Sequence, residues 1–170
     1  MKFSQYTNDS VENSQYMKWE EGENQIRIVS EPVICYKRFK DAENENVKVY
    51  LTKVEAMKDK KAKERSMFWA INRKTGKAQL VEAGPQIMEQ IKMLATTGDS
   101  KFEDLPPYDI YINKKGSGID TEYAVVAARS NVPLTPDEEE AVKGLKSVFD
   151  LLCDDALDAE AAKMDRFMSI

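Results

Sequence analysis

The segment from Tyr108 to Ala128 constrains the fold more than any other stretch of the chain. It reads YDIYINKKGSGIDTEYAVVAA, and Tyr111 separates Ile110 from Ile112, so that aliphatic residues recur at every second position. Successive side chains of a β-strand point to opposite faces, so this period of two predicts a strand on each side of the glycine-containing turn. The sequence therefore predicts an antiparallel β-hairpin in which Tyr111 points away from the core.

Similar alternation predicts further strands earlier in the chain. Residues 24–39 (NQIRIVSEPVICYKRF) predict a long strand that is broken or bulged at Pro32, because proline cannot donate to the hydrogen-bond ladder. Residues 47–51 (VKVYL) predict a short strand. Residues 66–72 and 78–83 predict a second hairpin, joined by a tight turn.

Two helices are expected among and after these strands. Residues 85–98 carry apolar side chains at helical spacing behind a first-turn proline. Thr135 is a suitable N-cap for a second helix, whose apolar positions continue to Leu152. Residues 53–65 are highly charged and predict a long loop or a loose helix.

This order of elements predicts a mainly β protein with added helices. A helix between the third and fourth major strands is the arrangement of the OB-fold, a five-stranded barrel. We therefore expect an OB-fold barrel followed by a C-terminal helix and an acidic tail. The expected segments are an irregular N-terminal segment (1–18), the OB-fold domain (19–132), the C-terminal helix (133–153) and the acidic tail (154–170).

The composition argues against several classes of site. The chain of 170 residues contains no histidine, which removes the commonest general base and the commonest metal ligand. Cys35 and Cys153 are far apart and form no paired metal-ligand motif, so we expect free thiols in a reducing compartment, with a disulfide as the alternative. No complete phosphate-loop or serine-nucleophile motif occurs. We therefore expect no enzymatic activity, no cofactor and no metal.

The distribution of apolar residues also bears on location. No N-terminal run resembles a signal peptide, and no stretch is apolar enough to span a bilayer. We therefore expect a cytoplasmic protein with no membrane partner.

Charge is distributed unevenly along the chain. The net charge is −5, yet residues 53–77 hold nine basic and three acidic side chains, a net charge of +6. Residues 131–170 hold ten acidic and four basic side chains, a net charge of −6. A tethered acidic segment is present at high effective concentration, so we expect it to compete with an anionic ligand for the basic region.

Three segments resemble bacteriophage single-stranded DNA-binding proteins. They are WEEGENQIRIVSEPV (19–33), FWAINRKTGKAQLVE (68–82) and YDIYINKKGSGIDTEY (108–123), and they occur in the order found in that family. The resemblance covers about residues 19–140 and implies an OB-fold that binds single-stranded DNA in phage replication or recombination, without enzymatic activity. The chain departs from the family in its lysine-rich 53–65 segment and in lacking an unbroken acidic block at its end.

A protein that binds single strands without sequence specificity needs aromatic faces for bases and spaced cations for phosphates. Phe68 and Trp69 are adjacent in a strand, so they point to opposite faces, and we expect only one of them in the core. An inward Trp69 and an outward Phe68 are favoured, because Trp69 shares its face with the more apolar set. The competing interpretation is a packed strand with solvated lysines. The expected DNA-binding residues are Tyr36, Lys37, Arg38, Phe39, Lys60, Lys61, Lys63, Arg65, Phe68, Trp69, Arg73, Lys74, Lys77 and Tyr111.

Two other functions compete with DNA binding. An OB-like module that binds only proteins is the main alternative, because a fold does not determine a function. A metal-dependent nuclease is the less favoured alternative, because its acid pairs lie in a tail that cannot exclude water. For residues 154–170 we weigh recruitment of replication or recombination proteins equally against packing as a terminal helix. Self-association on DNA is a further expectation.

Overall fold

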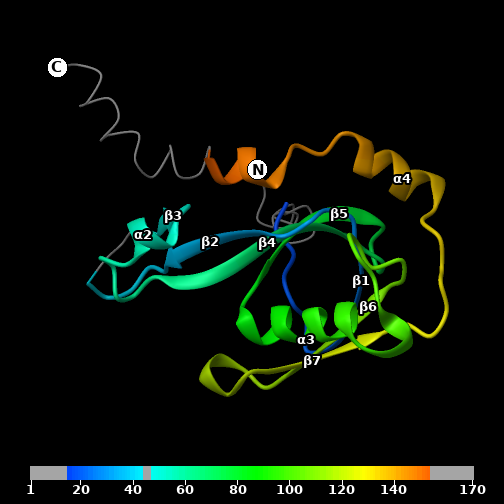
Figure 1. Ribbon diagram of the computed structural model, residues 1–170, viewed down its shortest axis with the longest axis horizontal. Coiled ribbons are helices and arrows are strands. Elements are labelled where there is room, and N and C mark those ends of the chain that lie inside the picture. Colours follow the sequence, from blue (N-terminus) through cyan, green and yellow to red (C-terminus); the bar gives the residue numbers. More distant parts are fainter. Residues whose placement is uncertain (1–14, 44–46, 154–170) are drawn as a thin grey trace, which may run out of the picture.

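The computed structural model describes residues 15–43 and 47–153 (Figure 1). The tail expected at 154–170 and most of the expected N-terminal segment lie outside these residues. The strands are β1 (Gly22–Ile28), β2 (Val33–Arg38), β3 (Lys48–Tyr50), β4 (Lys63–Asn72), β5 (Lys77–Ala83), β6 (Ile110–Lys115) and β7 (Glu122–Ala127). The helices are α2 (Lys53–Ala56), α3 (Pro85–Thr96) and α4 (Pro136–Lys143), with 3-10 turns η2 (Gly98–Ser100) and η3 (Gly118–Asp120).

The seven strands form one antiparallel sheet, so the expectation of a mainly β protein with added helices is confirmed. The order is β3-β2-β4-β1-β6-β7, and β5 also pairs with β4. The long strand β4 pairs with strands on both of its edges. On one edge its first half pairs with β2 and its last residues pair with β1, and on the other edge β5 pairs with most of its length. The predicted helix between the third and fourth major strands is present as α3.

The predicted break near Pro32 separates β1 from β2. Ile28 lies opposite Ala70 and Val33 lies opposite Met67, so two extra residues are accommodated between these pairs. The Ser30 hydroxyl accepts a hydrogen bond from the Trp69 backbone N–H at 2.7 Å and replaces a missing ladder bond. β1 and β2 are therefore one long strand with a bulge.

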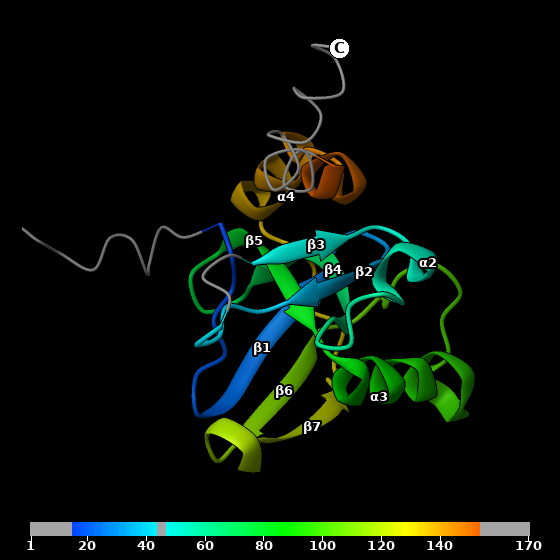
Figure 2. The same ribbon diagram turned by 90° about the vertical axis from the view of Figure 1, so that its left-hand side faces the viewer.

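The second predicted helix is shorter than expected. Thr135 caps α4 as predicted, and the Glu138 side chain completes a capping box. The helix ends at Gly144, and a separate helical segment occupies residues 148–153. We call residues 131–153 the C-terminal strap, because they cross the face of the sheet opposite α3 (Figure 1, Figure 2).

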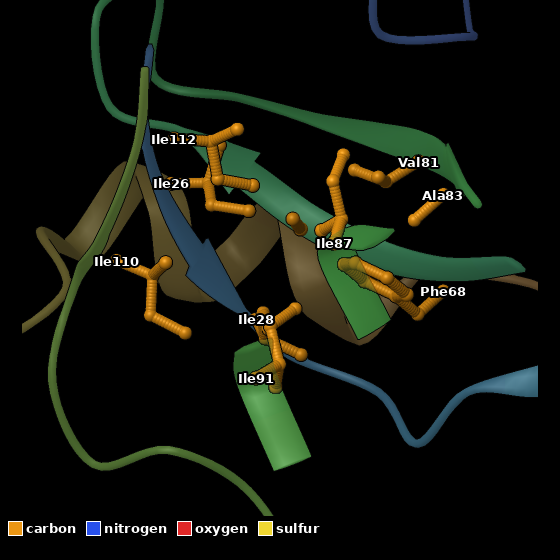
Figure 3. Packing of buried hydrophobic residues seen from close by; sticks show 10 residues of the cluster. Ile26, Ile28, Phe68, Val81, Ala83, Ile87, Ile91, Ile110 and Ile112 are labelled. Atoms are coloured by element: carbon orange, nitrogen blue, oxygen red, sulfur yellow. The ribbon is translucent and has the colours of Figure 1, made fainter. Parts of the chain in front are cut away.

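The sheet buries apolar side chains on both of its faces. On one face, Ile87 and Ile91 of α3 pack against residues of four strands (Figure 3). These strand residues are Ile26, Ile28, Phe68, Ala70, Val81, Ala83, Ile110 and Ile112. On the other face, Val148 and Leu152 of the C-terminal strap cover Cys35, Val49, Met67, Trp69 and Leu80. β4 therefore lies between two cores.

The sheet does not close into the expected five-stranded barrel, because β5 and β7 do not pair within the described residues. Residues 15–19 bridge part of this seam instead. The Leu80 N–H donates to the Gln15 carbonyl at 2.6 Å, and the Met17 N–H donates to the Leu80 carbonyl at 2.9 Å. On the β7 side, the Gln90 side chain donates to the Tyr123 carbonyl at 2.8 Å and accepts from the Val125 N–H at 3.0 Å. One side-chain amide of α3 thus occupies the edge of β7.

A buried carboxylate joins β1, the β4–β5 turn and β6. Asp109 is fully buried, and its two oxygens accept from Arg27 Nε at 2.8 Å and from Arg73 Nε at 3.1 Å. Gln25 Nε2 donates to the same carboxylate at 2.7 Å. Arg73 also donates to Glu138 of the C-terminal strap at 2.6 Å. We call these five side chains the ionic hub.

The ionic hub predicts a large effect for one substitution. Asp109→Asn should lower the free energy of unfolding by about 3–5 kcal/mol, because Arg27 loses its carboxylate partner and Arg73 keeps only Glu138. Chemical denaturation followed by circular dichroism measures this loss. Asp104→Asn, on an exposed loop, is the matched control and should change stability by less than about 0.5 kcal/mol. Equal stabilities of the two variants would contradict the importance of the ionic hub.

Candidate functional site

A groove of about 820 Å³ lies along the seam where the sheet fails to close. Residues 16–19, the ends of β2 and β5, and the start of α3 line it. We call it the seam groove. Its aromatic residues are Tyr16, Trp19, Phe39 and Tyr123, and its basic residues are Lys18, Lys37, Arg65 and Lys114.

Phe39 presents a ring in this groove near two cations. Its exposed fraction is 39%. The Arg65 guanidinium carbon lies 5.2 Å from the ring centroid, and Lys37 Nζ lies 5.9 Å from it. Both distances are within the range of cation–π attraction, so the cations help to hold the ring in place. The groove therefore offers a flat apolar surface next to positive charge.

The opposite side of the groove is built from residues that are distant in sequence. Trp19 and Tyr123 pack edge to face, with ring centroids 6.5 Å apart. Lys114 Nζ approaches the Trp19 carbonyl at 3.5 Å. Trp19 and Tyr123 also pack against the core under α3, which fixes this wall to the sheet.

The cations of the groove differ in how they are neutralised. Lys37 forms an ion pair with Glu82, the one acidic residue among those that line the groove. Arg65 has no ion pair with any described residue, and its Nε atom is buried without a hydrogen-bond partner there. Within the part of the chain that the structure describes, the Arg65 guanidinium of the groove thus has no acidic partner.

The groove contains three of the predicted site residues, namely Lys37, Phe39 and Arg65. Sequence reasoning missed its other aromatic and basic residues: Tyr16, Lys18, Trp19, Lys114 and Tyr123. The stretch YMKW (16–19) carried a usable signal, because it interleaves a base with two aromatic residues just as the YKRF stretch does. This stretch falls at the end of the segment predicted to be irregular (1–18), so no strand was predicted that would place its side chains.

A second group of predicted residues lies on a projecting lobe. We call β2, β3, α2 and residues 57–63 the basic lobe; it extends from the sheet on the left of Figure 1. Tyr36 and Arg38 lie on β2, and the Arg38 guanidinium is 3.2 Å from the Asp59 carboxylate. Lys60 and Lys63 are exposed. The lobe therefore carries predicted cations at a place separate from the groove.

The pKa values of two charged groups in the lobe, Asp59 and Lys61, are shifted from their usual values. The hydrogen bond donated by the Tyr50 hydroxyl, 2.7 Å long, is the main cause that lowers the pKa of Asp59. Hydrogen bonds to Asp41 and Glu43 raise the pKa of Lys61. Lys61 is thus less available for a phosphate than its exposure suggests.

The expectation that only one of Phe68 and Trp69 is core is wrong. Their exposed fractions are 1% and 5%. They point to opposite faces as predicted, but Phe68 lies under α3 and Trp69 lies under the C-terminal strap. The outward placement favoured for Phe68 is therefore corrected, and its ring is not open to a base.

The prediction for Arg73 is corrected in a similar way. Its guanidinium belongs to the ionic hub and is bound to Asp109 and Glu138, so it is not a free phosphate contact. Lys74 is exposed and pairs with Glu20 at 3.0 Å, and Lys77 is exposed at the start of β5. Tyr111 is half-buried and out of phase with the two core isoleucines of β6, as predicted.

The C-terminal strap is held over Trp69 by specific contacts. The indole N–H of Trp69 donates to the Lys146 carbonyl at 2.8 Å. Arg73 binds Glu138 and donates to the Pro133 carbonyl at 3.2 Å. Arg27 donates to the Val132 carbonyl. The strap is thus tied to the sheet by both arginines of the ionic hub.

No family model, curated protein or solved structure matches the chain. Over residues 15–43 and 47–153, no helix is long and apolar enough to cross a membrane. The same residues contain no group of three or more cysteine, aspartate or glutamate side chains placed to hold a metal ion.

The strap contacts lead to a prediction for Trp69. In a Trp19→Phe background, Trp69 is the sole tryptophan, and Glu138→Gln should make it more accessible to acrylamide and shift its emission to the red. The reason is that Arg73 loses the charged partner through which it holds α4. Glu139→Gln, at the neighbouring exposed position, is the control and should leave the emission unchanged. Identical quenching in both variants would show that the ion pair does not hold the strap.

Proposed function

We propose that the protein binds single-stranded DNA without sequence specificity, as phage single-stranded DNA-binding proteins do in replication or recombination, and that it is not an enzyme. One observation carries this proposal: the partly exposed ring of Phe39 lies near both Arg65 and Lys37 in the seam groove. Single strands expose base faces next to phosphates, and binders of this kind combine aromatic rings with spaced cations.

The arrangement of the elements supports an open form of the OB-fold. A long bulged first strand, the β4–β5 hairpin, α3 and the β6–β7 hairpin follow one another in the order of that fold. In this proposal, residues 15–19 and Gln90 take the place of the missing β5–β7 ladder.

The helices favour single strands over duplex DNA. A helix that reads the major groove must present one free face to the bases. Ile87 and Ile91 fix α3 against the core, and the Glu138–Arg73 ion pair fixes α4 to the sheet. The exposed residues of α4 include Asp137, Glu139 and Glu140, whose charges repel phosphates, whereas the groove exposes aromatic rings next to cations.

The basic lobe extends the proposed phosphate track. Lys60 is exposed, and Lys63 is exposed at the start of β4 opposite Lys37, close to the end of β2 that Phe39 follows. Long flexible lysine side chains suit contacts with the successive phosphates of a strand. Two further expectations are still predictions: residues 154–170 recruit partner proteins, and the protein self-associates on DNA.

A second candidate, a protein-binding module, rests on a different observation. Val54 and Met57, on and just after α2, have exposed fractions of 75% and 73%. Exposed apolar side chains on one short element are a feature of protein-docking surfaces. Val54→Ser with Met57→Ser should leave DNA affinity unchanged if these residues serve a protein partner, and should weaken it if they contact bases.

Titration of the protein with fluorescein-labelled oligo-dT, followed by anisotropy, tests the proposal. We expect preference for the single strand over a duplex of the same length. The logarithm of the affinity should fall with the logarithm of salt concentration, with a slope of about −0.7 for each phosphate neutralised. Equal affinities for both forms, or no dependence on salt, would contradict single-strand binding.

Phe39→Ala tests the ring itself. The substitution should cost about 1–3 kcal/mol of binding free energy, which is the usual contribution of one base stacked on an aromatic ring. The melting temperature should change little, because the ring lies at the surface. Phe149→Ala removes a more exposed phenylalanine on the C-terminal strap and serves as control. The same affinity for both variants would place the bases elsewhere.

A further inference from the structure

The guanidinium of Arg65 has no counter-charge among the described residues. Its central carbon lies 5.2 Å from the centroid of the Phe39 ring, and the group is so close to Gly84 that a Cβ atom there would come within 2.5 Å of its Nη1 atom. Its Nε atom is buried and has no hydrogen-bond partner among the described residues. Buried polar groups are nearly always satisfied, so an unpartnered one needs a physical explanation.

The surroundings of Arg65 add positive potential. α3 begins at Pro85, directly after its N-cap Gly84, and runs for 12 residues, with no side-chain cap and no acidic residue in its first turn. The free N–H groups of such a helix start carry partial positive charge. Glu82 is the acidic residue in the groove lining, and it is already paired with Lys37. A bound anion would compensate both the guanidinium and the helix start.

We propose that Arg65 and the start of α3 form a phosphate subsite of the seam groove, which binds a backbone phosphate of a single strand while the adjoining base stacks on Phe39. The planar fork of a guanidinium matches the oxygens of a phosphate, and its contact with Phe39 orients it. This inference rests on the proposed function. Gly84 has a positioning role, because the absence of its side chain leaves room for the guanidinium.

Two substitutions separate the charge of Arg65 from its position. Arg65→Gln removes the charge. Gly84→Ala keeps the charge but displaces the guanidinium, and it is compatible with the backbone, since φ is −84° at this position. The controls are Lys101→Gln, which removes an exposed charge outside the groove, and Gly144→Ala, where a Cβ atom meets nothing within 4 Å. Circular dichroism of each variant verifies folding.

Two ligands distinguish the source of the phosphate. With oligo-dT, Arg65→Gln and Gly84→Ala should each bind about tenfold more weakly than the wild type, and the salt slope of Arg65→Gln should fall by about 0.7. Both controls should stay within about twofold of the wild type. With inorganic pyrophosphate at constant ionic strength, the melting temperature of the wild type and the controls should rise, and that of Arg65→Gln should not.

The outcomes separate failure of this subsite from failure of the proposed function. If Arg65→Gln and Gly84→Ala bind oligo-dT with the affinity and the salt dependence of the wild type, the proposed subsite is wrong. Single-strand binding by the protein would not be contradicted by that result. A second outcome is that pyrophosphate stabilises the wild type through Arg65 while the wild type does not bind oligo-dT. Both the proposed function and the assignment of a strand phosphate to the subsite would then be wrong, and the site would be one for free phosphates. An equal pyrophosphate shift in Arg65→Gln would exclude Arg65 as the anion ligand.

Discussion

The buried carboxylate of Asp109 is the constraint on which the remaining structure depends. Removing a carboxylate and two guanidinium groups from water is costly, and the cost is offset only when each charge is well paired. Arg27, Arg73 and Gln25 meet this requirement only if β1, the β4–β5 turn and β6 occupy their observed places. The same arginines hold the C-terminal strap, so correct assembly of the sheet and correct placement of the strap are coupled.

Local sequence patterns predicted the helices and strands well, because each pattern depends only on residues that are close in sequence. The period of two in β6 and β7, the proline break before β2 and the Thr135 cap all act within a few positions. The burial of both Phe68 and Trp69 could not be predicted in this way. It depends on a second apolar layer contributed by Val148 and Leu152, which lie 79 to 84 residues further along the chain.

The candidate site was predictable only in part, for a related reason. Lys37, Phe39 and Arg65 stood out because bases and aromatic residues alternate in their strands. Whether a cation is free depends on acids that are distant in sequence. Arg73 is bound by Asp109 and Glu138, whereas Arg65 meets no acid among the described residues. Local charge patterns do not distinguish these two arginines.

The hydrogen bonds along the seam occupy the edges of β5 and β7. Unpaired edges are templates on which other strands can add, and barrels remove them by closing. In this protein a short bridge from residues 15–17 occupies the edge of β5, and the side chain of Gln90 occupies that of β7. Both edges are thus blocked against aggregation without a continuous ladder between them. The seam groove therefore stays open to solvent between two strands whose edges are nonetheless occupied.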